Sequence, residues 1–422
     1  MTITQRRIVY SLFFLLFFII SPLIVLYATG YRLDLTSGSI SKVGALYIKT
    51  YPSGAKVYRN NLYTKRKTPT QIVNIPSGLQ TISVIKDGYQ PWTKELRIEA
   101  GKTTFVEDIV LFRETFTSEK LGAGGSQLVL SPDRELAAYA DNNNKLAIVN
   151  LTAGTIDTSI ILPAASRIKR WSQDHSRLAY QTREQWNIVD IGSQKVWPLA
   201  NYIKGPISNL HFGSTGDDIW VQAGSSLWRL NLLTGKKQIA ANETKDFYIT
   251  ADSLVQLSSD NHLLLAKITT NSQQVYALPA GDYQYIADFR NDVVLLQGNN
   301  QFFIWSNEQL RDTISATQFD WRKNKIILTN GYDIWRYDTA DQSTTLLDRT
   351  GSQPQLIRWH PSESYITEVV GGQIQIIELD NRGEKRHLIT IAPLSQGDYT
   401  FDPKGEKIYI LTDKDFQQLT IQ

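Results

Sequence analysis

The chain has 422 residues, no cysteine and a single methionine. Without cysteine it has no disulfide framework, no thiolate metal site and no cysteine nucleophile. Neither charge is in excess: 44 Lys and Arg face 41 Asp and Glu, and a net charge of +3 gives no reason to expect a nucleic-acid partner. Aromatic residues are plentiful, with 20 Tyr and 10 Trp, and they favour β-structure. The length exceeds what one hydrophobic core supports, so two or more domains are expected.

One uncharged run, IVYSLFFLLFFIISPLIVLY from Ile8 to Tyr27, lies near the beginning of the chain. As a helix it would cover ~30 Å, the thickness of a bilayer's hydrocarbon layer. Arg6 and Arg7 precede it, and the positive-inside rule then predicts a cytoplasmic tail, a transmembrane helix and extracytoplasmic domains. The predicted tail is 1–7, and the helix that contacts the lipid bilayer is 8–28. The alternative is a cleaved signal peptide, but its apolar core is usually about 7–15 residues and this run is longer.

Short strand-like segments follow a predicted linker over 29–43. Leu46 and Ile48 alternate with more polar residues, and Asn60-Asn61 and Asp87-Gly88 have the composition of tight turns between strands. Several short strands separated by turns at this spacing predict a small β-sandwich over 44–113.

The turn motifs of this region resemble those of the PEGA domain. The resemblance covers most of residues 44–112, with Ser53 in place of the family's Glu and Arg66 where a Gly often stands. It implies an extracytoplasmic β-sandwich, frequent in envelope proteins, and it implies no catalysis. The motif residues are Pro52, Ser53, Gly54, Ala55, Thr68, Pro69, Gly78, Gly88 and Tyr89, with Pro76-Ser77 and Lys86-Asp87 beside them.

The rest of the chain, 114–422, repeats itself with a period of about 40 residues, which is the range of β-propeller blades. Each unit is an apolar strand, a polar turn, a second apolar strand, a short turn and a third strand. Eight units can be counted and seven is the alternative, because the middle units are weakly marked. The last unit has three strands, so 115–121 is expected to supply its fourth strand by pairing with 416–421. The fold class is therefore all-β, with one N-terminal helix, a sandwich and a propeller.

Two turns carry a further resemblance. Ser131-Pro132-Asp133 and Phe401-Asp402-Pro403-Lys404-Gly405 are similar to the blade turns of WD-repeat-like and Tol-system propellers. A membrane span, a PEGA module and a propeller together resemble a family of bacterial membrane proteins.

No catalytic, cofactor-binding or metal-binding residue is predicted. The five histidines lie in different repeats without metal-ligand spacing, and His175 and His360 are expected in solvated turns. Asp217-Asp218 is better explained as a solvated turn than as an acid pair. The stretch 122–125, Gly-Ala-Gly-Gly, lacks the context of a phosphate loop and is expected to be a flexible segment. The stretch 141–144 lacks the later Glu of a calcium loop and is expected to be a hairpin turn.

Two groups of residues have a structural and a functional interpretation. The repeated tryptophans, at 171, 321 and 359 and at 228 and 335, are expected in the cores between blades, with a stacking platform for sugars or peptides as the alternative. Lys65, Arg66 and Lys67 are expected either in a solvated loop or in contact with an anionic surface, such as lipid headgroups or a wall polymer.

The sequence thus predicts a membrane-anchored, extracytoplasmic binding or scaffold protein whose propeller presents a surface to an envelope protein or polymer. The alternatives are a propeller hydrolase or lyase acting on envelope glycans and a purely structural envelope component. Carboxylates converging in the central channel would favour the enzyme, whereas a broad aromatic or charged patch would favour binding.

Overall fold

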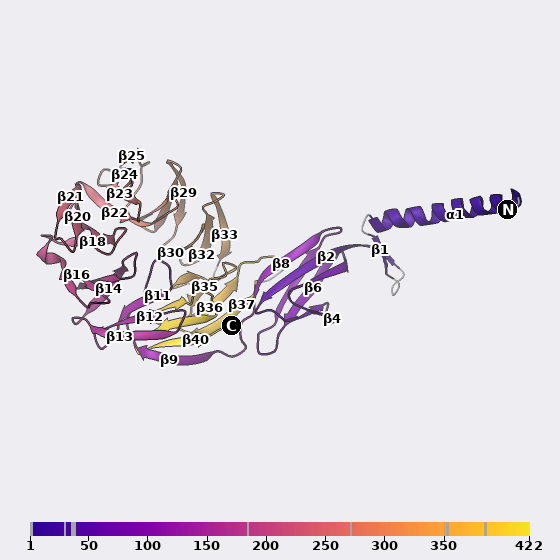
Figure 1. Ribbon diagram of the computed structural model, residues 1–422, viewed down its shortest axis with the longest axis horizontal. Helices are drawn as coiled ribbons and strands as arrows, with labels where there is room; N and C mark the ends of the chain where they lie inside the picture. Colours follow the sequence, from indigo (N-terminus) through magenta and orange to yellow (C-terminus); the bar gives the residue numbers. More distant parts are fainter. Residues whose placement is uncertain are drawn as a thin grey trace. The chain divides into compact units, whose positions relative to one another are not determined.

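The computed structural model is predominantly β, with one N-terminal helix (Figure 1). The chain divides into two compact units, of which unit 1 comprises 1–115, 378–387 and 422, and unit 2 comprises 116–377 and 388–421. The residues that the structure describes are 3–28, 31–34, 39–183, 185–270, 272–349, 351, 354–383 and 386–422.

Unit 1 begins with helix α1 (Ile3–Ala28). Its segment Gln5–Ala28 is long and apolar enough to cross a membrane, and none of its most apolar stretch is buried against protein. Phenylalanine, leucine and isoleucine side chains surround the helix without a polar face, which is the pattern of a helix in lipid and not of an amphipathic one. The predicted helix over 8–28 is therefore present, and it begins five residues earlier than expected.

The sandwich of unit 1 consists of two four-stranded sheets. Its buried core is built from alternating positions of both sheets and includes Leu46, Ile48, Val57, Ile82 and Trp92, all at most 1% exposed. In the first sheet β2 pairs with β1, β5 and β8, and the second has the order β4-β3-β6-β7. The strands are β1 (Tyr31–Asp34), β2 (Ser39–Tyr51), β3 (Lys56–Arg59), β4 (Leu62–Lys67), β5 (Thr70–Pro76), β6 (Gly78–Ile85), β7 (Trp92–Ile98) and β8 (Thr103–Val110).

Within the interval predicted as a linker, 29–43, the structure contains β-structure. Strand β1 and the beginning of β2 pair antiparallel, from Tyr31 with Lys42 to Asp34 with Ser39. Sequence alternation alone did not mark this pair, because Tyr31–Asp34 is too short to show a period.

Segment 378–387, which begins with the last residue of strand β36 (Gln373–Glu378) and ends before strand β37 (Leu388–Pro393), also belongs to unit 1. Its Glu378 accepts the indole N–H of Trp92 at 3.0 Å and pairs with the ammonium group of Lys94 at 2.7 Å. The Lys94 and Glu378 side chains are 2% and 4% exposed, so this ion pair is buried. Arg382 donates to the carbonyl oxygen of Phe105 at 2.9 Å. The sandwich is therefore completed by a segment that lies almost three hundred residues later in the chain.

Unit 2 is a β-propeller, and in the described residues it has eight four-stranded sheets, here called blades 1 to 8. Blade 1 consists of β10 (Val129–Leu130), β11 (Leu136–Ala140), β12 (Lys145–Asn150) and β13 (Thr155–Ile161), and blade 2 of β14 (Ser166–Trp171), β15 (Arg177–Thr182), β16 (Gln185–Asp190) and β17 (Val196–Pro198). Blade 3 consists of β18 (Ile207–Phe212), β19 (Asp218–Ala223), β20 (Ser226–Asn231) and β21 (Lys237–Ala241), and blade 4 of β22 (Thr244–Ile249), β23 (Ser253–Ser258), β24 (His262–Lys267) and β25 (Ser272–Ala277). A 3₁₀ turn, η1 (Leu199–Asn201), follows β17.

Blades 5 to 8 continue the same pattern. Blade 5 consists of β26 (Tyr285–Arg290), β27 (Val293–Gly298), β28 (Gln301–Ser306) and β29 (Gln309–Ser315), and blade 6 of β30 (Gln318–Arg322), β31 (Lys325–Thr329), β32 (Asp333–Asp338) and β33 (Ser343–Arg349). Blade 7 consists of β34 (Ile357–Trp359), β35 (Tyr365–Val370), β36 (Gln373–Glu378) and β37 (Leu388–Pro393), and blade 8 of β38 (Asp398–Phe401), β39 (Lys407–Leu411), β40 (Asp415–Thr420) and β9 (Thr117–Ala123).

Blade 8 confirms the predicted closure. Its first three strands come from the end of the sequence, and its fourth, β9, comes from the beginning of unit 2 (Figure 1). Strand β9 pairs antiparallel with β40 from Thr117 with Thr420 to Ala123 with Asp415. The pairing lies about two residues later in β9 than expected. Gly122 and Ala123 therefore belong to a strand. The prediction of a flexible segment over 122–125 is wrong for these two residues.

The cores of the propeller lie between neighbouring blades. Tyr139 of blade 1 and Tyr409 and Phe416 of blade 8 pack in one buried cluster, and similar clusters join blades 2 and 3, 4 and 5, and 5 and 6. Trp171, Trp321 and Trp359 are 1–3% exposed, which confirms the core interpretation of this repeated tryptophan. The remaining two repeated tryptophans, 228 and 335, are partly buried against such clusters.

Candidate binding site at the propeller channel

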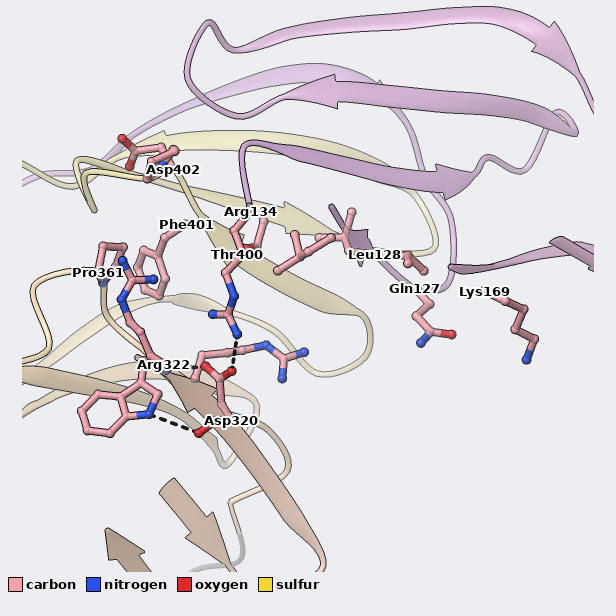
Figure 2. Close-up of a pocket in the computed structure, with 15 residues that line it drawn as sticks. Gln127, Leu128, Arg134, Lys169, Asp320, Arg322, Pro361, Thr400, Phe401 and Asp402 are labelled. Carbon is pink, nitrogen blue, oxygen red and sulfur yellow. Dashed lines mark hydrogen bonds and ion pairs between the residues drawn. The ribbon is translucent and has the colours of Figure 1, made fainter. Parts of the chain in front are cut away.

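The first strands of successive blades contact one another, as β10 does with β14 and β30 with β34. Where these strands end, a cavity of about 290 Å³ opens, here called the channel pocket (Figure 2). Its walls come from blades 1, 2, 6, 7 and 8. The lining residues are Gln127, Leu128, Val129, Leu130, Arg134, Lys169, Asp320, Arg322, Arg358, Trp359, Pro361, Thr400, Phe401, Asp402 and Pro403.

Acidic side chains on the first strands hold neighbouring blades together. Asp246 accepts the backbone N–H of Ile286 at 2.7 Å, and Asp320 accepts that of Trp359 at 2.8 Å. Asp398 accepts the backbone N–H of Leu128 at 3.2 Å. Each bond joins one blade to the next, so the carboxylates that approach the channel are occupied by main-chain donors.

The ionised state of Asp320 is stabilised although the side chain is buried. Burial by itself raises the pKa of this carboxyl, but Arg134 and Arg358 outweigh it and hold the pKa below its ordinary value. Arg134 donates to Asp320 at 2.8 Å, as Figure 2 shows. Asp402, the other acid of the pocket, accepts the N–H groups of Lys404 at 3.2 Å and Lys407 at 2.7 Å. Neither acid is therefore arranged as a free general base.

Bulges in the first strands set how side chains face the channel. The register shifts in β14 between Ile168 and Arg170, and shifts of the same kind occur in β18, β22 and β26. In β14 the extra residue is Lys169. A bulge locally bends a strand and redirects a side chain, which explains how Lys169 and Arg170 both line pockets at the channel.

Cationic side chains outnumber acids in the channel pocket, with Arg134, Lys169, Arg322 and Arg358 against two carboxylates. Arg134 is paired as described, and Arg358 pairs with Asp398 at 3.2 Å. The other two are different. Within the described part of the chain Lys169 makes no hydrogen bond or ion pair, and the Nε of Arg322 is buried and makes no hydrogen bond.

A second cavity of about 330 Å³ adjoins the channel pocket and shares Lys169 with it. Arg170 lies there 2.9 Å from the Nδ1 of His211, and its guanidinium is 5.9 Å from the ring centre of Tyr248. Burial, together with the charge of Arg170, lowers the pKa of His211 well below its ordinary value. His211 is therefore neutral at physiological pH, and the positive charge of this cavity comes from Lys169 and Arg170.

The histidine predictions had mixed outcomes. His175 lies in a turn with a 30% exposed side chain, 3.4 Å from Asp133. His360, expected to be solvated, is fully buried, and its ring lies 2.9 Å from the hydroxyl of Ser362 and 3.2 Å from the carbonyl oxygen of Gly405. Burial lowers the pKa of His360 to about 4. The prediction for His360 was wrong because the turn that carries it packs beneath the next blade.

The other candidate motifs are structural in this fold. Asp217 and Asp218 are separated by their partners, Arg177 for the first and Arg229, at 2.9 Å, for the second. Stretch 141–144 is the turn between β11 and β12, as expected. In the described residues no group of three or more His, Asp or Glu side chains is arranged to hold a metal ion.

The structure places the PEGA motif residues at turns and in the core of the sandwich. Ala55 is fully buried, and its N–H donates to the hydroxyl of Thr68 at 3.1 Å. Gly54, Gly78 and Gly88 have positive φ angles of 84°, 121° and 82°. The turn at Asn60-Asn61 also has the predicted left-handed backbone. Peptide bonds 51–52 and 68–69, which precede Pro52 and Pro69, are cis, and Ser53 lies between Pro52 and Gly54, while Tyr89 packs against the core.

Lys65, Arg66 and Lys67 are all exposed, but they lie in strand β4 and not in a loop. Strand β4 is at the edge of its sheet, and Lys65 has a φ of 59° at an irregularity of the pairing with β3. The three cationic side chains are thus displayed on a sheet edge.

Sequence reasoning missed the cationic residues of the channel. The signal was nevertheless present, because an arginine stands next to the repeated tryptophan in 170–171, 321–322 and 358–359. Arg322 and Arg358 line the channel pocket and Arg170 lines the adjoining cavity, and this placement depends on how blades 2, 6 and 7 close into a ring, which the spacing of the repeats does not reveal.

The comparisons with known proteins agree with both units. Residues 43–109 match the PEGA domain family. The C-terminal WD40 domain of Sif2 superposes with a TM-score of 0.53 at 13% identity, over 72% of this chain and 98% of that chain. The computationally designed Ika8 protein follows with a TM-score of 0.49 at 12% identity, over 72% and 98% of the two chains. No curated protein sequence matches the chain.

These findings define a class of protein: a β-propeller preceded by an N-terminal apolar helix. More particularly, the chain carries a PEGA domain between the helix and a WD40-like propeller. The likeness to Sif2 shows the fold alone, since the same fold serves many functions.

Proposed function

We propose that this protein is a membrane-anchored, extracytoplasmic binding or scaffold protein, and that its propeller presents the channel pocket to an envelope protein or polymer. Helix α1 anchors the chain in the membrane and the PEGA sandwich is the membrane-proximal domain. In this proposal the cytoplasmic tail is 1–7, the transmembrane helix 8–28, the linker 29–43, the sandwich 44–113 and the propeller 114–422. The observation that carries the proposal is a pocket whose acids are occupied by structural hydrogen bonds while cationic side chains remain available.

The alternative function, a hydrolase or lyase acting on envelope glycans, is less well supported. Such an enzyme needs carboxylates that converge on substrate with at least one free oxygen each. Asp320 and Asp402 both use their oxygens within the protein. A binding role needs no such group.

A pull-down from native membranes tests the proposal. The bait is the full chain with a C-terminal tag, and the control bait is an unrelated single-pass membrane protein that carries the same tag. We expect a partner that is retained by the full chain and lost from the control. Recovery of the same partners with both baits, or release of sugar products from isolated wall glycan by the purified chain, would contradict the proposal.

We further propose that Lys65, Arg66 and Lys67 contact an anionic surface. Basic residues near a membrane attract anionic lipids with about 1 kcal/mol each. The exposure of all three on β4 supports this role. Replacing them by glutamine should weaken binding of the chain without its helix to vesicles that contain phosphatidylglycerol, and binding to neutral vesicles serves as the control.

A further inference from the structure

We propose that the channel pocket binds an acidic peptide segment of a partner protein, with Arg322 and Lys169 as the two residues that receive its carboxylates. This inference rests on the proposed function and names the chemistry of its ligand. It follows from which cations of the pocket have no aspartate partner, from where these cations lie, and from the other residues that line the pocket.

Arg322 has a positive charge that the protein leaves under-compensated. Its nearest acid is Glu363, 3.8 Å away, and Glu363 is also paired with Lys323 at 2.5 Å. The Arg322 side chain is only 21% exposed. Burial, and then the neighbouring charge of Arg134, lower the pKa of Arg322. A guanidinium that is partly desolvated next to another cation is stabilised by an anion that enters the pocket, and its planar fork fits a carboxylate.

Lys169 supplies the second free cation. It is exposed, occupies the bulge of β14 and borders both cavities at the channel. Figure 2 shows Arg322 on the side of Pro361 and Phe401, and Lys169 beside Gln127 on the opposite side of the pocket. Two further cations of the pocket, Arg134 and Arg358, are already paired with aspartates. The pocket therefore has two cations that no aspartate pairs with, Arg322 and Lys169, and two whose charge an aspartate balances.

This distribution favours a peptide over a uniformly charged polymer. A polyphosphate or a teichoic-acid-like chain carries charge at every repeat and would need free cations along its whole path. A peptide with two acidic residues separated by small neutral ones needs cations only at the ends. The uncharged lining residues include aliphatic and proline side chains, and the side chain of Gln127 can hydrogen-bond to a peptide group.

The pocket is poorly suited to a neutral sugar. Carbohydrate recognition uses an open aromatic face. The two aromatic residues of the wall, Trp359 and Phe401, are 2% and 6% exposed because they pack between blades. Their rings are therefore not available for stacking.

The test uses the full chain in detergent and fluorescence anisotropy. The probe is a short fluorescein-labelled peptide of alternating glutamate and alanine, and the reference peptide has glutamine in place of glutamate. We expect the acidic peptide to bind more tightly than the reference and to weaken with added salt. Arg322→Gln should weaken binding by about ten- to a hundredfold, the usual loss for a charged hydrogen bond at a partly buried site, and Lys169→Gln, at an exposed position, by about two- to fivefold.

Matched variants show whether the acidic peptide binds at the pocket or is attracted to any positive charge on the protein. Lys120→Gln removes an exposed lysine from β9, outside the pocket, and should leave binding unchanged. Thermal melting shows whether Arg322→Gln still folds, and Lys169→Gln, at an exposed position, gives an independent measurement if it does not. Equal binding of both peptides, or undiminished binding by the Lys169 variant, would overturn the proposal.

Competition with inorganic polyphosphate tests whether the pocket prefers a uniformly charged polymer to an acidic peptide. If it displaces the acidic peptide at a lower concentration of charge, the pocket is a polyanion site and the peptide assignment is wrong. The pull-down separates this inference from the proposed function. A partner retained by the Arg322→Gln, Lys169→Gln double variant would refute the pocket assignment and keep the binding function, whereas the absence of any partner specific to the full chain would refute the binding function.

Discussion

At the scale of single residues, a few side chains have environments that determine their chemistry. Asn60, Asn61 and Gly88 adopt left-handed backbone conformations in the tight turns of the sandwich. Glu368 and His360 are titratable groups buried in unit 2. The backbone conformation of the first three residues is set by the turns they occupy, and the pKa of the last two is set by their burial.

Replacing Gly88 by valine should destabilise the sandwich. Gly88 has a φ of 82°, and a Cβ added there would meet no atom within 4 Å, so the cost comes from the backbone conformation and not from crowding. A β-branched residue in this conformation costs about 1–3 kcal/mol. Thermal melting of the full chain measures the effect. Gly88→Asn is the matched control, because asparagine tolerates positive φ, and an equal loss in both variants would contradict this explanation.

Glu368 should make the stability of the propeller depend on pH. Burial, with a smaller effect of Asp348, raises the pKa of Glu368 from near 4.5 to about 7. Between these values the unfolded chain loses the proton and the folded chain keeps it, so the free energy of unfolding falls as pH rises from about 4.5 to 7. The loss is about 3 kcal/mol in all. Above pH 7 both states are ionised and no further loss follows.

The measurement is the difference between the original chain and Glu368→Gln at pH 5 and at pH 8, in chemical denaturation. The variant should gain stability relative to the original chain at pH 8. The original chain has to be compared with the variant because His360 also makes stability depend on pH, in the opposite direction. With a pKa of about 4 in the folded chain, His360 lowers the free energy of unfolding as pH falls from about 6.5. Glu135→Gln, at an exposed position, should show no such change. A pH-independent difference for the Glu368 variant would contradict the assigned pKa.

At the scale of elements, two long-range pairings complete the units. Strand β9 completes blade 8 more than 290 residues before its partner β40. Segment 378–387 completes unit 1 through Glu378. In both cases an edge or a buried charge in one part of the chain is satisfied by a distant part, so local stability depends on the whole chain.

Removing β9 should open the propeller. A chain that begins at Gly124 would leave β40 as an unpaired edge and would remove Leu121 from the core shared by blades 8 and 1. Such a chain should aggregate or melt at a lower temperature, since an unpaired edge strand invites association. The chain that begins at Arg113 keeps β9 and is the control. Identical melting of the two chains would mean that β9 does not close the propeller.

Replacing Lys94 by methionine should destabilise unit 1. The variant leaves Glu378 buried without its cation, which costs about 3–5 kcal/mol in comparable sites. The double variant Lys94→Met, Glu378→Leu removes both charges and should recover much of the loss. Lys102→Met breaks an exposed pair with Glu99 and should leave the melting temperature unchanged. If the single and double variants melt alike, the buried pair does not contribute in this way.

At the scale of the whole molecule, the order of helix, sandwich and propeller along the chain fits a membrane-anchored protein. The chain carries its cationic pair Arg6 and Arg7 ahead of the apolar run and its globular units after it. Under the positive-inside rule, this order is the basis of the proposed orientation, in which the sandwich and the propeller lie outside the cytoplasm.

A C-terminal tag should therefore be accessible from outside the cell membrane. Protease added to intact spheroplasts should degrade the tag, and a cytoplasmic protein should survive as the control. The chain itself should remain in the membrane fraction after carbonate washing, because an apolar helix of this length holds it in the bilayer. A protected tag would contradict the orientation, and a soluble product that begins near Tyr31 would show that the segment is a cleaved signal.

Much of this protein follows from the sequence alone, because its patterns are local. An uncharged run predicts a helix in lipid, alternation predicts strands, and Asn60-Asn61 and Gly88 predict the turns that the structure contains. The repeat predicts blades, and the missing strand of the last one predicts the closure by β9. Each depends on residues close in sequence or on counting equal units.

The tertiary structure decided what depends on residues far apart. The burial of His360, the ion pair of Lys94 with Glu378, and the meeting of Arg322 with Lys169 in one pocket require blades or segments to approach from distant parts of the chain. A side chain's burial and charge environment are set by these neighbours and not by its own type. The sequence therefore determined the architecture of this protein, and the closing of the ring determined which of its charged side chains have an oppositely charged neighbour.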